Sequence, residues 1–154
     1  MTRILMVCLG NICRSPLAHG VLESKLPSSK FFIDSAGTAA YHIGNRPDRR
    51  SIEVAGLHGI DISTQRARQF KVSDFDTFDY IYAMDASNYT NIINLARNTD
   101  DIGKVKLFLE EHPTISNKNV PDPYYGDMTD FEHVFDLVEA TSNRIAQKLL
   151  STPL

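Results

Sequence analysis

The sequence has only two cysteines, no long hydrophobic run and no surplus of positive charge. A membrane-spanning helix needs about 20 consecutive apolar residues. The apolar run at the N-terminus stops at Gly10–Asn11, which is also too short for the core of a signal peptide. We therefore expect no membrane insertion and a cytoplasmic location. Cys8 and Cys13 are too few and too close for the disulfide framework of a secreted domain. Neither belongs to a C-x-x-C pair, and the histidines show no metal-ligand spacing, so we expect no metal site and no cofactor.

Positively charged residues do not exceed negatively charged ones. There are 16 Lys and Arg against 19 Asp and Glu, a formal net charge of −3. Proteins that bind nucleic acid usually carry a clear basic surplus, so nucleic acid is not an expected partner. Small basic clusters, Arg46 with Arg49–Arg50 and Arg66 with Arg68, still allow a local anion site. With 42% hydrophobic and 23% charged residues, we expect residues 1–154 to form one globular domain.

Apolar runs of strand length alternate along the chain with stretches of helical periodicity, which is typical of an α/β fold. Strands are predicted at residues 4–7, 31–33, 80–84 and 105–109. Helices are predicted between and after them, with N-caps at Ser15, at Asp48, at Asp85 or Ser87, and in a capping box from Thr129 to Glu132. This order predicts a small four-stranded parallel sheet with helices on both faces and right-handed crossovers, a flavodoxin-like or Rossmann-like three-layer architecture.

Two long irregular stretches, residues 38–47 and roughly 110–128, are candidate binding loops. Ligands of open parallel sheets bind at the carboxyl ends of the strands, beside the point where strand order reverses. The segment that follows the first predicted strand, residues 8–16, lies at such an end and leads into a helix.

This segment, Cys-Leu-Gly-Asn-Ile-Cys-Arg-Ser-Pro, is suited to anion binding. The helix N-terminus after it offers unpaired N–H groups and a positive partial charge. Five residues separate Cys8 from Arg14, enough for the backbone to curl so that successive N–H groups point inward. Gly10 and Asn11 are suited to the positive φ that such a curl needs. Because Arg14 also supplies a planar, two-pronged donor that matches a phosphate, the loop predicts a phosphate-binding cradle.

Cys8 lies at the mouth of this predicted cradle. The N–H dipoles, the helix N-terminus and Arg14 all favour its thiolate, which is the nucleophilic form. A phosphate in the cradle would place its phosphorus against the sulfur. A small buried apolar residue at a strand end is the alternative interpretation of Cys8. The apolar strand before the loop, Gly10–Asn11 inside it and Ser15–Pro16 after it favour the phosphate chemistry.

The loop resembles the active-site loop of the low-molecular-weight protein tyrosine phosphatases. The resemblance continues in the same order along essentially the whole chain, through the motifs at Asp34–Thr38, Ala67–Gln69, Ala83–Asp85 and Val120–Gly126. It implies hydrolysis of phosphotyrosine and small aryl phosphate monoesters through a cysteinyl-phosphate intermediate, without a metal. Tyrosine-phosphorylated proteins or peptides are the implied partners, and inorganic phosphate is the implied product. The implied nucleophile is Cys8, and the implied phosphate-binding residues are Leu9, Gly10, Asn11, Ile12, Cys13, Arg14 and Ser15.

Asp122 is the candidate general acid and base. Phosphoryl transfer to sulfur leaves an alkoxide or phenoxide, which benefits from a proton donor, and Pro121 and Pro123 restrict the backbone on either side of Asp122. An ordinary Asp in a Pro-rich turn is the alternative; the resemblance implies the acid. It also implies that Tyr124 and Tyr125 form one aromatic rim of the cleft and that an aromatic residue at position 41, here Tyr41, lies on the opposite wall. Alternatively, one of the tyrosine pair packs under the loop and Tyr41 is a surface residue.

The resemblance gives further roles to residues of the loop. Ser15 is predicted as an N-cap, and it matches a hydroxyl that hydrogen-bonds the sulfur; Asn11 matches the Asn that fixes the loop conformation. Cys13 matches a second cysteine that can form a disulfide with the nucleophile. Many family members carry a His at the position of Gln65, where it supports the loop Asn; because Gln can also hydrogen-bond, we expect an altered rather than a lost site. The five histidines are predicted to be mostly surface residues.

Other functions remain open at this stage. A thioredoxin-coupled arsenate reductase shares the fold and loop but needs further cysteines, and the chain has none beyond Cys8 and Cys13. A protein-arginine phosphatase of the same family tends to carry Thr where Ile12 stands, and Ile12 suits an aryl ester better. A phosphopeptide-binding module without activity would be expected to lack Cys8, Arg14 or Asp122, and all three are present. A flavodoxin-like electron carrier would share the architecture, but no residue pattern marks a flavin site.

Overall fold

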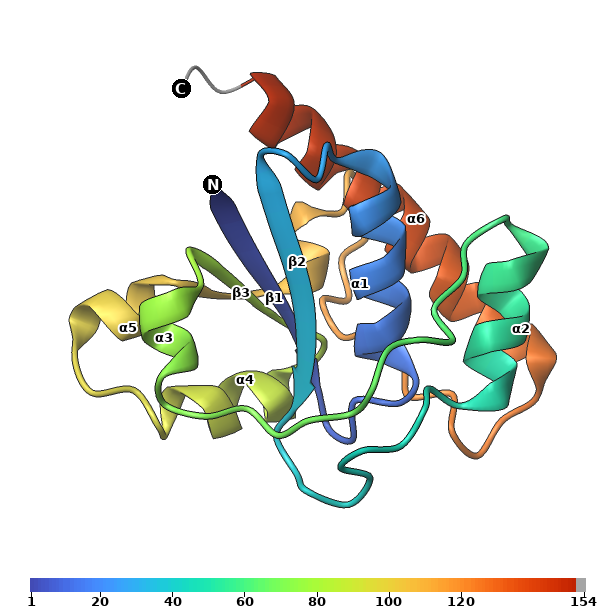
Figure 1. Cartoon of the computed structure of the whole chain (residues 1–154), viewed down its shortest axis with the longest axis horizontal. Helices are drawn as coiled ribbons and strands as arrows, with labels where there is room; N and C mark the ends of the chain where they lie inside the picture. The colour runs from blue at the N-terminus through green and yellow to red at the C-terminus, as the bar shows by residue number, and fades with distance from the viewer. Residues whose placement is uncertain (152–154) are drawn as a thin grey trace.

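Four parallel strands form the centre of the structure that a computed structural model gives for residues 1–151 (Figure 1). Their order across the sheet is β2-β1-β3-β4. The strands are β1 (Thr2–Cys8), β2 (Phe31–Gly37), β3 (Tyr80–Ala83) and β4 (Val105–Leu107). The chain turns to one side of β1 to form β2 and then crosses to the other side to form β3. The strand order therefore reverses between β1 and β3, and the carboxyl ends of these two strands are the expected place for a ligand.

Both faces of the sheet are covered by helices (Figure 1). Side chains of β1 alternate between the two faces: Ile4 and Met6 belong to one apolar cluster, and Leu5 and Val7 to the other. The first cluster is covered by α1 (Arg14–Lys25), α2 (Arg49–Leu57) and α6 (Met128–Ser151). The second face carries the shorter helices α3 (Asp74–Thr77), α4 (Ala86–Ile93) and α5 (Thr99–Gly103). The predicted three-layer α/β architecture is confirmed.

Two of the predicted helix starts are confirmed by their caps. Asp48 accepts the backbone N–H of Arg50 at the start of α2, and Asp85, rather than Ser87, accepts the N–H of Asn88 at the start of α4. Both are short acidic side chains that can satisfy an otherwise unpaired N–H of the first turn.

The two other predicted caps are wrong. α1 starts at Arg14 without a side-chain cap, so Ser15 lies inside its first turn and its hydroxyl is free for another partner. The capping box of α6 forms between Asp127 and Asp130, not between Thr129 and Glu132. Asp127 Oδ1 accepts the N–H groups of Thr129 and Asp130, and Asp130 Oδ2 accepts the N–H of Asp127.

Some boundaries also differ from the prediction. β4 ends at Leu107, two residues before the predicted end of the strand at residue 109. Residues 108–111 form a 3₁₀ turn instead. α4 ends at Ile93, before Ala96. The short helices α3 and α5 have too few residues to give a periodic pattern. The predicted domain end at residue 154 lies outside the described residues. Within residues 1–151, no helix combines the length and the apolar character needed to cross a membrane.

Candidate active site

A cleft of about 320 Å³ opens at the carboxyl end of β1. Three segments that are distant in the sequence form its walls: the loop after β1, the irregular stretch 38–47 and the irregular stretch that precedes α6. Its lining residues are Cys8, Leu9, Gly10, Ile12, Cys13, Arg14, Tyr41, His42, Asp122, Tyr124 and Tyr125. Most predicted site residues therefore meet in one cleft. Asn11 and Ser15 do not line it; they are buried behind it.

The segment 8–15, which runs from the last residue of β1 into the first turn of α1, is called the phosphate loop below. Its carbonyl groups are hydrogen-bonded by amides of other segments: Thr38 donates to Cys8, Ala39 to Leu9 and Asp48 to Ile12, at 2.8–2.9 Å. Carbonyl groups that face outward along a curled loop leave the N–H groups to face inward, which supports the expected cradle.

The curl depends on two unusual backbone features. Asn11 has a φ of 57°, as expected, but Gly10 does not share the positive φ predicted for it. The lack of a side chain at Gly37 matters instead, because a Cβ there would lie 2.7 Å from the carbonyl oxygen of Leu9. Gly37 ends β2 and lets the phosphate loop pass directly against that strand. Its motif was visible in the sequence, but this steric reason was not.

Within the phosphate loop, a chain of hydrogen bonds leads from Asn11 through Ser15 to the sulfur of Cys8. The side-chain N–H of Asn11 donates to Ser15 Oγ at 2.8 Å, and Ser15 Oγ lies 3.0 Å from Cys8 Sγ. Because Ser15 Oγ already accepts a bond from Asn11, its own proton is available to the sulfur. The Ser15 hydroxyl is thus directed at the Cys8 sulfur.

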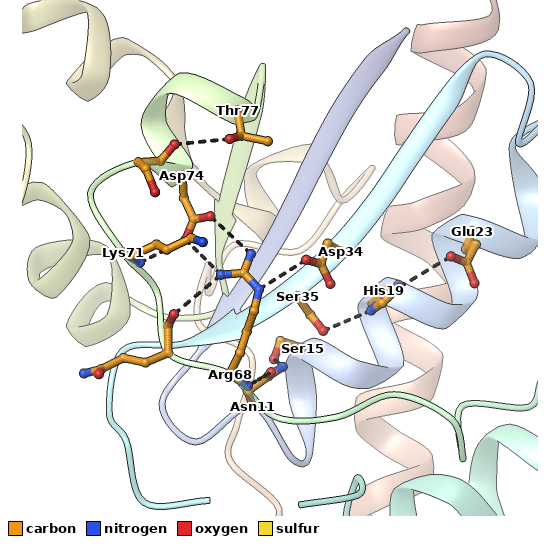
Figure 2. A network of polar contacts seen from close by, with 12 residues as sticks. Asn11, Ser15, His19, Glu23, Asp34, Ser35, Arg68, Lys71, Asp74 and Thr77 are labelled. Atoms are coloured by element: carbon orange, nitrogen blue, oxygen red, sulfur yellow. Dashed lines mark hydrogen bonds and ion pairs between the residues drawn. The ribbon is translucent and has the colours of Figure 1, made fainter. Parts of the chain in front are cut away.

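Arg68 completes this network from another segment (Figure 2). Its backbone N–H donates to Asn11 Oδ1 at 3.1 Å, while its guanidinium lies between Asp34 and the buried Asp74, with contacts of 3.0–3.2 Å. Burial acts to lower the pKa of Arg68, but the bonds and charge of Asp74, with those of Asp34, raise it above its ordinary value. Asn11 is thus held from both sides.

Gln65 does not take the place of the family His. Its Nε2 donates to the carbonyl of Pro16 at 3.2 Å, and its buried Oε1 has no hydrogen-bond partner among residues 1–151. The backbone of Arg68 supports Asn11 instead. A backbone N–H leaves no trace in the residue type, so the sequence could not reveal this substitute.

Arg14 is buried with its charged end at the base of the cleft. Its Nη1 donates to Asp85 Oδ2 at 2.6 Å and to the carbonyl of Val120 at 3.0 Å, and its Nη2 lies 3.7 Å from Asp122 Oδ2. Burial acts to lower the pKa of Arg14, but the Cys8 sulfur and the Asp85 carboxylate raise it above its ordinary value. A charged, oriented guanidinium therefore faces the cleft, where it could bind an anion. The sequence predicted Asp85 only as a cap.

Cys13 lies at the cleft with a different environment from that of Cys8. Burial, followed by the negative charge of Asp48, strongly raises the pKa of the Cys13 thiol. Cys13 therefore stays protonated at neutral pH and is a poor nucleophile. Both cysteines are free thiols in this structure.

Asp122 and the aromatic residues form the mouth of the cleft. The Asp122 side chain is 47% exposed, and its Oδ1 accepts the backbone N–H of Tyr124 at 3.1 Å. Tyr124 and Tyr125 pack edge to face with ring centres 4.9 Å apart on this side. Tyr41, which is 75% exposed, lies on another part of the lining. A flat ring that enters between these side chains would meet the sulfur at the base.

The prediction that the histidines are mostly surface residues needs correction. His19, His42 and His112 are half-buried. His42 lines the cleft, and its ring packs against Gly10, where a Cβ would lie 3.0 Å from His42 Cδ2. His19 lies 3.0 Å from Ser35 Oγ and 3.4 Å from Glu23 (Figure 2).

Within residues 1–151, no cluster of three or more His, Cys, Asp or Glu could hold a metal ion.

Comparison with known proteins agrees with this arrangement. The family model described as low molecular weight phosphotyrosine protein phosphatase matches residues 3–152. A curated relative of that name from Schizosaccharomyces pombe is 43% identical over 147 residues, which cover 92% of this chain and 93% of that protein. The human protein of the same name is 42% identical over 137 residues, with 86% and 85% covered.

Solved structures agree as well. The crystal structure of a protein tyrosine phosphatase from Entamoeba histolytica, with Hepes in the active site, superposes with a TM-score of 0.92 at 36% identity and 97% coverage of both chains. The chain therefore belongs to the family of low molecular weight protein-tyrosine phosphatases.

Proposed function

We propose that the chain is a single phosphatase domain that hydrolyses phosphotyrosine and small aryl phosphate monoesters through a cysteinyl-phosphate intermediate. In the first step the Cys8 thiolate attacks phosphorus, so that an S–P bond forms and the P–O bond to the aromatic ring breaks. The electron pair of the broken bond moves to the phenolic oxygen, and the carboxylic acid of Asp122 donates the proton that yields tyrosine.

In the second step a water molecule replaces the sulfur on phosphorus. The Asp122 carboxylate accepts a proton from the water, the new P–O bond forms, and the S–P bond breaks to return the thiolate. Ser15 stabilises the departing sulfur by its hydrogen bond, while Arg14 and the inward N–H groups stabilise the charge on the transferring group. Leu9, Gly10, Ile12 and Cys13 contribute to phosphate binding through the loop that they form.

The observation that carries this proposal is the common cleft of Cys8, Arg14 and Asp122. A nucleophile, a cation for the phosphate oxygens and an acid for the leaving group meet there, although 107 residues separate Arg14 from Asp122. The aromatic side chains at the mouth favour a phenyl ring as the leaving group. Ile12 lines the cleft at the position where arginine phosphatases of the family tend to carry Thr, and its apolar side chain suits an aryl ester better.

We further propose that tyrosine-phosphorylated proteins or peptides are the substrates and that the enzyme works in the cytoplasm. The thiol chemistry supports this location. A nucleophilic Cys8 with a free Cys13 close by in the same loop needs a reducing compartment to stay active.

A comparison of two phosphopeptides tests the proposed function. The protein is expected to release phosphate from a phosphotyrosine peptide and to be at least about 100-fold slower on a matched phosphoarginine peptide. Cys8→Ser should reduce turnover of both to the background, because a serine hydroxyl is a far weaker nucleophile at neutral pH than a thiolate. Turnover by Cys8→Ser at the wild-type rate, or a preference for phosphoarginine, would contradict the proposal.

A further inference from the structure

Arg50 lies in the first turn of α2 and does not itself line the cleft. It contacts three parts of the chain: Asp48, residues 124–126 and Phe131. Its Nε and Nη2 donate to the two carboxylate oxygens of Asp48, at 3.1 and 3.0 Å. Its Nη1 donates to the carbonyl of Gly126 at 2.9 Å, and its Nη2 to the carbonyl of Tyr124 at 2.8 Å. The guanidinium carbon lies 4.4 Å from the ring centre of Phe131 in α6. The planar group is therefore bound along its edge and stacked on its face.

One end of this arrangement is attached to the phosphate loop. Asp48 donates its backbone N–H to the carbonyl of Ile12 at 2.8 Å, while its carboxylate pairs with Arg50. Burial acts to raise the pKa of Asp48, but the side-chain and backbone hydrogen bonds of Arg50 outweigh it and lower the pKa below its ordinary value. Asp48 is therefore ionised at neutral pH and orients the guanidinium of Arg50.

The other end is attached to residues 122–127, called the acid loop below. The peptide groups of Tyr124 are bound on both sides: its N–H donates to Asp122 Oδ1 at 3.1 Å, and its carbonyl accepts from Arg50 at 2.8 Å. The place of Tyr124 therefore sets the direction of the Asp122 carboxylate, whose Oδ2 faces Arg14 at 3.7 Å. Asp122 is half exposed, so packing alone leaves its carboxylate free to rotate.

We propose that Arg50 is a positioning residue for the general acid. It fixes the distance between the phosphate loop and the acid loop, so that the proton of Asp122 reaches the leaving oxygen while Cys8 reaches the phosphorus. This inference rests on the proposed function. It requires that the loss of Arg50 harms the reaction only as far as the reaction depends on Asp122.

Two substrates with different leaving groups test this requirement. Phenyl phosphate releases a strongly basic phenolate that needs a proton, whereas p-nitrophenyl phosphate releases a weakly basic one that does not. The measured quantity is kcat/KM, which covers the steps up to phosphoryl transfer to Cys8. We expect Arg50→Gln to lower kcat/KM for phenyl phosphate by about 10- to 100-fold, the usual cost of a small misplacement, and for p-nitrophenyl phosphate by under about threefold.

Matched variants separate position from charge and from folding. Arg49→Gln removes the same charge from the neighbouring residue, which is exposed. This variant should leave kcat/KM unchanged for both substrates. Arg50→Lys keeps the charge but loses the planar fork, so it should show the same substrate-dependent loss as Arg50→Gln. Thermal unfolding of each variant reports its stability. A loss of stability alone would lower kcat/KM equally for the two substrates.

A double variant connects the effect to Asp122. In the Asp122→Ala background, Arg50→Gln should change kcat/KM for phenyl phosphate by under about twofold, because no acid is left to position. Equal losses on both substrates, or a full further loss in the double variant, would overturn the role of Arg50. If Asp122→Ala itself showed no loss on phenyl phosphate, the acid of the proposed function would be wrong, and the inference with it.

Discussion

The phosphate loop and the acid loop face each other across one cleft but are built in different ways. The phosphate loop is short and continuous, and its key side chains Asn11, Arg14 and Ser15 are buried. The acid loop is exposed: Tyr125 is 96% accessible and the Asp122 side chain 47%. The first is held by its own curl, by the end of β2 and by bonds from distant residues, among them Arg68 on Asn11 and Asp85 on Arg14. The second depends on Arg50, more than 70 positions away in the sequence. A buried phosphate loop with many bonds thus faces an exposed acid loop that a few long-range contacts hold.

Removal of Asp122 changes the acid loop and leaves the phosphate loop intact, and it should slow the reaction more than loss of the Asp48–Arg50 ion pair. Asp122→Ala should lower kcat/KM for phenyl phosphate by about 10²- to 10⁴-fold, the usual contribution of acid catalysis. It should affect p-nitrophenyl phosphate much less, because the phosphate loop and Cys8 remain intact. Steady-state kinetics with a series of substituted phenyl phosphates measures this. An equal loss for every leaving group would mean that Asp122 does not donate the proton.

The ion pair of Asp48 and Arg50 connects the two loops, and its loss should have a smaller effect that depends on pH. Asp48→Asn keeps a good helix cap but removes the charge that binds Arg50. At pH 7 we expect the variant to be less stable by about 1 kcal/mol, or a Tm lower by about 2–4 °C. The folded-state pKa of Asp48 is lowered, so its charge stabilises the native state above its ordinary pKa of about 3.9.

The stability that the Asp48 carboxylate contributes depends on pH. As the pH falls through the lowered folded pKa, the wild-type carboxylate becomes protonated and the stabilisation is lost. The difference in Tm between wild type and Asp48→Asn should therefore shrink as the pH falls below about 4, as followed by circular dichroism. A difference that is constant, or that grows in acid, would contradict the assignment of this ion pair.

The two loops also differ in how far the sequence could predict them. The fold and the phosphate loop were predictable, because apolar runs give the strands and the loop's residue types lie within nine positions of one another. Asp122 was predictable as a candidate from its flanking prolines, and through the family resemblance. Arg50 was visible only as a member of a basic cluster, because its partners in the acid loop are backbone carbonyls that no residue type reveals. The same holds for the amide of Arg68 on Asn11.

The wrong predictions share a physical cause. Ser15 suits a helix cap as well as it suits a sulfur, and only the tertiary arrangement decides that it faces Cys8. The capping box of α6 forms at Asp127 and Asp130, because Asp serves there as well as the Thr and Glu that were predicted. The partial burial of His42 depends on its close contact with Gly10, which lies in another segment.

The most direct test of the account is to trap the phosphoryl group on the enzyme. In Asp122→Ala, p-nitrophenyl phosphate should still phosphorylate the sulfur, while hydrolysis of the intermediate slows because no base activates water. Rapid quenching in denaturant, followed by mass spectrometry of the peptides, should find one phosphoryl group on Cys8 and none on Cys13. A burst of p-nitrophenol without label on Cys8, or label on any other residue, would contradict the central claim.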